Sequence, residues 1–253
     1  MMTDAIHRFD ERSEEYDRFR PSYPVEMMNF LRVEVGLDAS HVVVDVGAGT
    51  GKLTEILLQN ENRAYAVEPN DRMRVIAERN LSRYKKYISV KGTAEEMNVP
   101  DHAADFVFAA QAFHWFDVRR ARQEFRRILR GGGMVVLIWN VRNTHGSDFL
   151  TAYNEILRTY SSGYAAHERD KIDDEKIGSL YGSRKYKTAY FPYSQTLSED
   201  GLVERILSNT YAPSPDDDNY EEMLDAVRAL FGELNKDGKV YIEYTTNVVY
   251  GAL

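Results

Sequence analysis

Three closely spaced glycines constrain this chain more than any other feature. Residues 42–46 read Val-Val-Val-Asp-Val, and Gly47, Gly49 and Gly51 follow at alternate positions. The apolar run predicts a buried strand, and the spacing of Leu and Ile residues after the last glycine predicts a helix. Glycine lets a backbone approach a ligand closely, and the N–H groups at a helix start attract anionic or polar groups. The stretch therefore predicts a nucleotide-type cofactor site at the carboxyl end of a parallel strand.

The spacing of the motif narrows the choice of cofactor. A dinucleotide-binding turn has the pattern Gly-x-Gly-x-x-Gly, whereas Asp45-x-Gly47-x-Gly49-x-Gly51 is one residue shorter. The motif is not a phosphate-binding P-loop either, because Lys52 follows glycines that lie too close together. The missing third glycine spacing disfavours a nicotinamide-dependent oxidoreductase. The glycines alone leave open a turn with a purely structural role.

The amino-acid composition limits the classes of protein to which this chain can belong. The 253 residues suffice for one large α/β domain or two small ones, and a formal net charge of -8 argues against a nucleic-acid-binding body. With no cysteine there is no disulfide framework and no thiolate metal site, and we expect no metal. The N-terminus has no apolar signal core, and the longest apolar run, residues 134–139, is too short to span a bilayer. We therefore expect a cytoplasmic enzyme that binds neither nucleic acid nor membrane.

Several segments together resemble one enzyme family. Asp-x-Gly-x-Gly-x-Gly after a valine-rich strand resembles motif I of the class I S-adenosylmethionine-dependent methyltransferases. Three further segments resemble the type 11 and trans-aconitate methyltransferase-like branch: residues 16–24 (Tyr-Asp-Arg-Phe-Arg-Pro-Ser-Tyr-Pro), 92–95 (Gly-Thr-Ala-Glu) and 111–116 (Gln-Ala-Phe-His-Trp-Phe). The resemblance covers nearly the whole chain. It implies S-adenosyl-L-methionine as the cofactor and a small-molecule methyl acceptor as the partner.

The resemblance also implies an architecture. We expect an α/β, doubly wound, seven-stranded Rossmann-like sheet of order 3-2-1-4-5-7-6, with the last strand antiparallel. Residues 1–253 would form a single methyltransferase domain, with residues 1–36 as an N-terminal helical cap. Residues 141–190 are expected to be a lid insertion, since long non-core segments are often lids or binding loops. Within it, Tyr160, Tyr164 and Tyr181 are candidate pocket residues, although each is equally compatible with a surface excursion.

The resemblance assigns cofactor contacts residue by residue. Glu68 follows the second predicted strand at the spacing where an acidic residue meets ribose hydroxyls in related folds. The family pattern implies that Tyr16 and Arg20 reach the methionine carboxylate. Residues 93–95 would read the adenine edge, although Thr93 and Glu96 also fit a helix capping box. The expected cofactor-binding residues are Tyr16, Arg20, Asp45, Gly47, Ala48, Gly49, Gly51, Glu68, Pro69, Met73, Thr93, Ala94, Glu95 and Gln111.

Gln111 and His114 are the candidate catalytic residues. They follow the fourth predicted strand, residues 104–110, and would be the polar side chains nearest the transferred methyl group. His114 is equally readable as a packed residue among aromatic side chains, and we expect Trp115 and Phe116 to be core. A carboxylate acceptor needs no base, whereas a hydroxyl or amine acceptor needs one, and His114 is the best candidate.

A basic helix is predicted after Asp117, ended by the glycines at 131–133. Its outer face carries Arg119, Arg120, Arg122, Arg126, Arg127 and Arg130. Such a face is typically solvated, and a docking surface for an acidic carrier protein is the alternative.

For the whole chain, the alternatives to methyl transfer are a non-catalytic, cofactor-binding regulatory protein and, less favoured, an NAD-dependent oxidoreductase.

Overall fold

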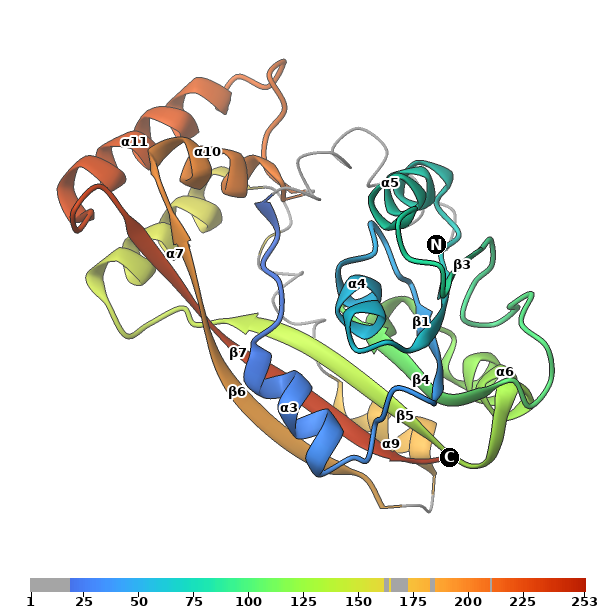
Figure 1. Ribbon diagram of the computed structural model, residues 1–253. Helices are drawn as coiled ribbons and strands as arrows, with labels where there is room; N and C mark the ends of the chain where they lie inside the picture. Colours follow the sequence, from blue (N-terminus) through green and yellow to red (C-terminus); the bar gives the residue numbers. More distant parts are fainter. Residues whose placement is uncertain (1–18, 162–163, 165–172, 183–184, 210) are drawn as a thin grey trace.

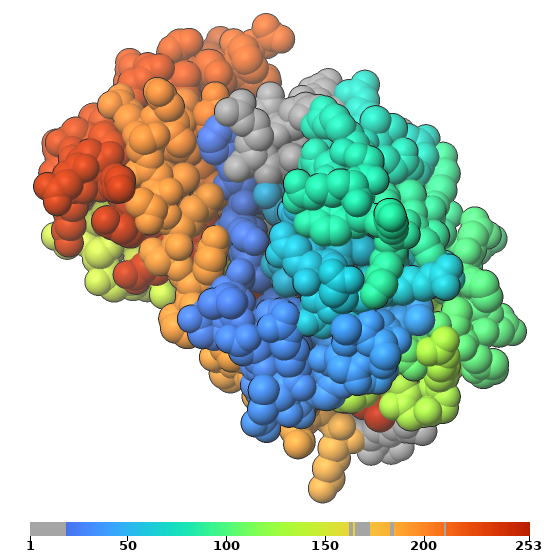
Figure 2. Space-filling view, viewed as in Figure 1, coloured from blue at the N-terminus to red at the C-terminus, as the bar shows by residue number. Residues whose placement is uncertain are grey.

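A seven-stranded mixed sheet forms the centre of the computed structural model (Figure 1). The structure describes residues 19–161, 164, 173–182, 185–209 and 211–253, which are drawn in colour in the space-filling view of Figure 2. The strand order is β3-β2-β1-β4-β5-β7-β6, as predicted. β1 to β5 are parallel neighbours, and β7 is antiparallel to both β5 and β6. The strands are β1 (Val42–Val46), β2 (Arg63–Val67), β3 (Tyr87–Val90), β4 (Ala104–Ala110), β5 (Leu129–Arg142), β6 (Lys187–Leu197) and β7 (Val240–Ala252).

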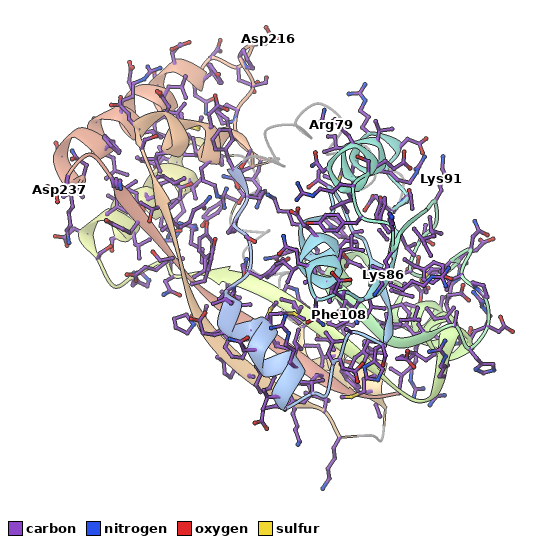
Figure 3. The ribbon with its side chains drawn as sticks, viewed as in Figure 1. Arg79, Lys86, Lys91, Phe108, Asp216 and Asp237 are labelled. Carbon is purple, nitrogen blue, oxygen red and sulfur yellow. The ribbon has the colours of Figure 1, made fainter. Side chains whose placement is uncertain are left out.

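Helices cover the sheet and start at polar capping residues. Asn70, Asp117 and Ser198, among others, accept a hydrogen bond from a backbone N–H three residues later. Charged side chains such as Arg79 and Lys91 point outward (Figure 3). No helix within the described ranges is long and apolar enough to cross a membrane. The helices are α3 (Val25–Val33), α4 (Lys52–Gln59), α5 (Asp71–Leu81), the 3₁₀ turn η1 (Phe113–Trp115), α6 (Val118–Ile128), α7 (Asp148–Tyr160), α9 (Asp174–Tyr181), α10 (Glu199–Leu207) and α11 (Tyr220–Leu234).

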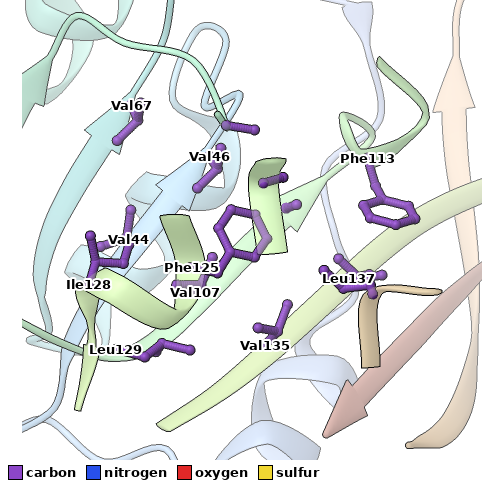
Figure 4. Close-up of a cluster of buried hydrophobic side chains, with 14 of the residues drawn as sticks. Val44, Val46, Val67, Val107, Phe113, Phe125, Ile128, Leu129, Val135 and Leu137 are labelled. Carbon is purple, nitrogen blue, oxygen red and sulfur yellow. The ribbon is translucent and has the colours of Figure 1, made fainter. Parts of the chain in front are cut away.

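Alternate side chains of the central strands bury opposite faces of the sheet. On β5, Val135 and Leu137 join one cluster, whereas Val136 and Ile138 join the other. The first cluster includes side chains of α6 and α9, and Figure 4 shows Phe125 of α6 within it. The second includes side chains of α3 and α4 on the opposite face. Helices on both faces of a largely parallel sheet make the fold doubly wound, as expected.

A third hydrophobic cluster lies beyond the central sheet. It consists of buried side chains from α7, α10 and α11 and from the ends of β6 and β7, including Tyr153, Leu202 and Tyr244. Figure 1 shows these helices gathered at one end of the two long strands, away from α4 and α5. We call this unit the second lobe. A hydrophobic cluster beyond the central sheet was not predicted from the sequence.

The predicted lid, residues 141–190, is not one unit in the structure. Its first part completes β5, its last part starts β6, and α7 packs against α11 in the second lobe. α9 packs against α6, and Ile177, Leu180 and Tyr181 join the central core. Tyr181 is therefore not a pocket residue, since its hydroxyl group donates to the backbone oxygen of Val135 at 3.1 Å. Tyr164 is buried in the second lobe, where Tyr160 packs partly exposed.

Two local predictions for the chain between β3 and β5 were wrong. The basic helix ends at Ile128 rather than at the glycines, because Leu129 adopts an extended backbone and pairs with Ala104. Residues 93–96 form a tight turn closed by a bridge between Thr93 and Glu96, so they do not start a helix.

The solvated face of α6 is also smaller than predicted. Arg127 donates to the Glu124 and Asp101 carboxylates and to the backbone oxygens of Met97 and Val99, at distances of 2.5–3.0 Å. Arg127 therefore holds the loop before β4 against α6. It is not a free cation on the surface.

Truncating Leu180 tests whether α9 is core. Leu180 is 0% exposed, so Leu180→Ala should lower the free energy of unfolding by about 2–5 kcal/mol, through lost burial and a residual cavity. Urea unfolding measures the change, and exposed Ser179→Ala on the same helix is the control. A change below about 0.5 kcal/mol for Leu180→Ala would support a loosely attached lid instead.

Candidate functional site

One cavity lies where the central sheet meets the second lobe. The glycine turn and the start of the loop after β4 form one side, and residues of β5, α7 and α10 form the other. The segment before α3 also reaches it, and Figure 1 shows that segment between the two parts of the molecule. The lining residues are Arg20, Pro21, Tyr23, Asp45, Gly47, Ala48, Gly49, Thr50, Lys52, Leu53, Ala110, Gln111, His114, Trp115, Asn140, Arg142, Tyr153, Leu157, Arg205, Asn209, Tyr211 and Tyr244.

The glycine turn is fixed by backbone hydrogen bonds at the ends of β1 and β2. The N–H groups of Gly47 and Ala48 donate to the Val67 oxygen at 2.9 and 3.1 Å. Gly47 has φ +70°, and a Cβ atom there would lie 2.6 Å from the Ala112 Cβ atom. Any larger residue would clash with the loop after β4 and adopt a strained backbone. Glycine is thus required here to bring two strand ends together beside the cavity.

Glu68 lies directly behind the turn. Its Oε2 atom accepts from the Gly49 N–H at 2.8 Å and its Oε1 atom from the Asn70 N–H at 2.9 Å. The side chain is buried, and burial raises its pKa, while the two backbone donors oppose the rise. Each carboxylate oxygen keeps a second lone pair. Glu68 therefore positions the turn and retains the capacity to accept from ligand hydroxyl groups.

Asp45 places a buried carboxyl group in the wall of the cavity. It is 1% exposed, and its Oδ2 atom accepts from the Thr54 hydroxyl group at 2.6 Å. Its Oδ1 atom has no hydrogen-bond partner within the described structure. Burial raises the pKa of Asp45 from 3.8 to about 7; Thr54 opposes the rise and the neighbouring Glu68 adds to it. A cationic ligand group would stabilise the ionised form.

Gln111 and His114 both line the cavity, so the structure brings the two catalytic candidates together. Gln111 adopts φ +55°, which is uncommon outside glycine, and its N–H donates to the Ile138 oxygen at 2.9 Å. Its Nε2 atom donates to the Asn140 oxygen at 3.3 Å. Trp115, expected in the core, is instead 38% exposed, and its ring lies tilted beside the His114 ring, with the two ring centroids 4.7 Å apart.

The other predicted cofactor residues differ in where they lie relative to the cavity. Arg20, Ala48 and Gly49 line the cavity, and Arg20 also donates to the Ser208 oxygen at 3.3 Å. Met73 lies beside Gly49, with its sulfur 3.8 Å from where a Gly49 Cβ atom would be. Gly51 is the N-cap of α4, and Pro69 is half-buried at the end of β2. Tyr16 lies outside the described residues.

Residues 93–95 follow β3 and do not line the cavity. Ala94 is buried, and the Thr93 hydroxyl group accepts from the Glu95 N–H at 3.3 Å. Glu95 accepts from the Asp117 N–H at 2.8 Å through its Oε1 atom. The observed role of Glu95 is therefore to hold the start of α6.

Polar residues at the end of β5 and in the second lobe also line the cavity, and they were not predicted from the sequence. Arg142 ends β5, Tyr153 lies on α7, and Arg205 lies on α10. Two features of the sequence could have indicated these residues. Arg205 shares a helix face with the apolar Leu202 and Ile206, and Arg142 follows the apolar part of a parallel strand at its carboxyl end, where ligands bind.

Comparisons with known proteins agree with this geometry. Residues 44–137 match the family model described as "Methyltransferase domain". An uncharacterized methyltransferase of Mycobacterium tuberculosis is 41% identical over 128 residues, which cover 51% of this chain and 50% of that protein. The chain thus spans about half the length of that relative. An uncharacterized methyltransferase-like protein of Schizosaccharomyces pombe is 25% identical over 241 residues, covering 92% of this chain and 90% of the relative.

The fold comparison extends over almost the whole chain. A solved structure assigned to the type II methyltransferases, from Anaeromyxobacter dehalogenans, superposes with a TM-score of 0.65 at 18% identity, covering 92% of this chain and 98% of that one. Residues 44–137 thus match a methyltransferase domain, and these similarities support a class I S-adenosylmethionine-dependent methyltransferase. That family and fold imply S-adenosylmethionine as the cofactor.

The site of this methyltransferase domain fits that cofactor. The orphaned Oδ1 atom of Asp45 is an acceptor suited to an ammonium group, and Glu68 is an acceptor suited to ribose hydroxyl groups. The glycine turn leaves its backbone close to the cavity. When bound, S-adenosylmethionine would supply an electrophilic methyl group.

Replacing Glu68 tests the cofactor site. Glu68→Gln keeps an oxygen for one backbone N–H group but removes the charge that strengthens hydrogen bonds to hydroxyl groups. We expect the Kd for S-adenosylhomocysteine to rise about 10–100-fold by calorimetric titration. Glu78→Gln, on the exposed face of α5, is the matched control. Unchanged affinity in Glu68→Gln would remove this residue from the site.

The raised pKa of Asp45 predicts a pH-dependent stability. The native state holds this proton up to about pH 7, whereas the unfolded chain releases it near 3.8, so the stability that Asp45 contributes falls as pH rises through this window. Asp45→Asn should therefore raise the free energy of unfolding at pH 8, by about 4 kcal/mol at most, with a smaller gain at pH 5. Urea unfolding at both pH values measures this. Equal gains at both would contradict the assignment.

Proposed function

We propose that this protein transfers the methyl group of S-adenosylmethionine to a carboxylate oxygen of a small-molecule acceptor. The observation that carries the proposal is one cavity shared by the glycine turn, by Gln111 and His114, and by basic side chains of β5 and α10. Among the described residues that line it, four are cationic (Arg20, Lys52, Arg142 and Arg205) and one, Asp45, is acidic. A cavity with this balance favours an anionic acceptor.

The chain's own residues need to do little chemistry in this reaction. A carboxylate is already a nucleophile at neutral pH, so no proton has to be removed from it. Gln111 and His114 would orient the acceptor in line with the methyl donor, and closure of the cavity would exclude water. For a hydroxyl or amine acceptor, His114 would also accept the proton.

The finer assignments belong to the same proposal. The segment at 111–116 supports placement in the trans-aconitate methyltransferase-like branch, and its two polar residues line the cavity. We also propose a cytoplasmic setting, with the small-molecule acceptor as the partner and no role for nucleic acid or membrane. The match to a methyltransferase family model favours this function over a nicotinamide-dependent oxidoreductase. An assay of methyl transfer distinguishes this function from the alternative of a non-catalytic, cofactor-binding regulatory protein.

Methyl transfer from radiolabelled S-adenosylmethionine to a panel of acids, alcohols and amines tests the function. We expect labelled products from acids, with the label released by mild base as in a methyl ester. Gln111→Ala and His114→Ala should each lower kcat about 10–100-fold, because orientation at the reacting atoms is lost, while S-adenosylhomocysteine affinity changes less than twofold.

The matched controls are Gln123→Ala and His145→Ala, both exposed outside this cavity. Full turnover by both Gln111→Ala and His114→Ala would remove that segment from the reacting centre. Label transferred only to alcohols or amines would overturn the carboxylate assignment. Cofactor binding without transfer to any class would favour the regulatory alternative.

A further inference from the structure

Two guanidinium groups on the acceptor side of the cavity, that of the buried Arg205 and that of the half-buried Arg142, have no carboxylate partner among the described residues. Arg205 is 5% exposed and donates only to neutral groups: the Tyr244 hydroxyl, the Ser208 hydroxyl and the Asn209 amide oxygen, at 3.1–3.4 Å. Arg142 donates to the Asn154 amide oxygen at 3.0 Å and to the Tyr164 hydroxyl. Burying a charge without a counter-charge costs several kcal/mol, so an anion is the expected complement.

The same wall holds two polar atoms without partners. The Nη1 atom of Arg142 and the hydroxyl oxygen of Tyr153 are both buried, and neither has a hydrogen-bond partner within the described structure. The Arg142 guanidinium lies 5.0 Å from the centre of the Tyr153 ring. Burial raises the pKa of Tyr153, against the opposing charges of Arg205 and Arg142, so its hydroxyl group stays protonated and able to donate. Unmade hydrogen bonds of buried groups are costly, which marks them as groups that a ligand completes.

We propose that Arg142, Arg205 and Tyr153 form a subsite for a carboxylate of the acceptor other than the one that is methylated. The inference rests on the proposed function and deepens it, because it makes the acceptor a small dicarboxylic acid. The planar guanidinium of Arg142 offers a donor directed at one carboxylate oxygen, and the Tyr153 hydroxyl offers a second. Arg205 supplies further positive charge from α10. The subsite lies at the end of β5 and in the second lobe, whereas the reacting groups belong to the loop after β4.

Matched acids and amides test the subsite, with malonate, succinate and glutarate each compared with its monoamide and diamide. In protein saturated with S-adenosylhomocysteine, diacid and monoamide should bind in calorimetric titration, and the diamide at least 10-fold more weakly. In turnover, the diacid should be methylated, whereas the monoamide should inhibit, because its carboxylate fills the subsite and its amide faces the reacting groups.

Variants of Arg142 and Tyr153 then test whether these two side chains form the subsite. Arg142→Gln should weaken diacid binding at least 10-fold and raise KM more than it lowers kcat. Tyr153→Phe should weaken it about 3–10-fold without lowering the melting temperature, because the hydroxyl group has no partner to lose. Both should leave S-adenosylhomocysteine affinity unchanged within twofold. The controls are Arg126→Gln and Tyr190→Phe, both exposed outside the cavity.

The outcomes separate the two proposals. If acids are methylated and neither variant changes diacid affinity, the subsite is wrong and the proposed function stands. If the variants weaken S-adenosylhomocysteine binding as much as diacid binding, these residues hold the cofactor carboxylate and the subsite is overturned. If S-adenosylhomocysteine binds but no acid of the series does, the subsite is also overturned. If acids bind through Arg142 and Tyr153 but no methyl group is transferred, the proposed function fails and the anion site stands.

Discussion

The carboxylate of Glu68 joins two loops, and the geometry of the cofactor side depends on it. One oxygen accepts from Gly49 in the turn after β1, and the other accepts from Asn70 at the start of α5. Asn70 in turn caps α5 by accepting from the Met73 N–H. A single buried side chain thus sets the spacing between the glycine turn and the neighbouring helix. This contact needs burial to be strong, and burial also raises the pKa of the carboxyl group.

Asp45 shows the cost of that arrangement. It lies in the same buried region, and the charge of Glu68 adds to the rise in its pKa. Two acidic groups sharing a site of low dielectric constant destabilise each other's ionised forms. Local strain of this kind is tolerated where a ligand relieves it, and a cationic ligand group beside Asp45 would do so. The same logic holds with opposite sign across the cavity, where Arg142 of β5 and Arg205 of α10 have no carboxylate partner in the part of the chain that the structure describes.

Much of the fold could be predicted from the sequence, because apolar alternation and turn residues act locally. The bounds of β1 and β4 agree with the residues that the patterns indicated, 42–46 and 104–110. The glycines at 131–133 misled the prediction, since glycine permits both a helix end and a strand, and pairing with β4 decides between them. The second lobe could not be predicted, because amphipathic patterns show that a helix face is buried but not against which partner.

The lack of tertiary information in a sequence pattern also explains which residues of the site could be predicted and which could not. Residues beside the glycine turn were found because a local motif fixes their positions, as for Gly47 and Gln111. Arg142 and Arg205 lie far apart in sequence, and the structure brings them to one cavity through β5 and α10. A charged residue on an apolar helix face, as with Arg205, was the available signal. It does not reveal the partner until the tertiary structure is known.

The division of charge between the two sides of the cavity bears on how binding energy would be used. Methyl transfer to a carboxylate removes one positive charge from the donor and one negative charge from the acceptor atom. A carboxylate held by Arg142 and Tyr153 keeps its charge throughout the reaction, so its interaction energy is similar in the ground state and the transition state. Such uniform binding lowers KM without accelerating the chemical step. The role of the second lobe would then be to select and orient the acceptor, leaving the acceleration to Gln111, His114 and the exclusion of water.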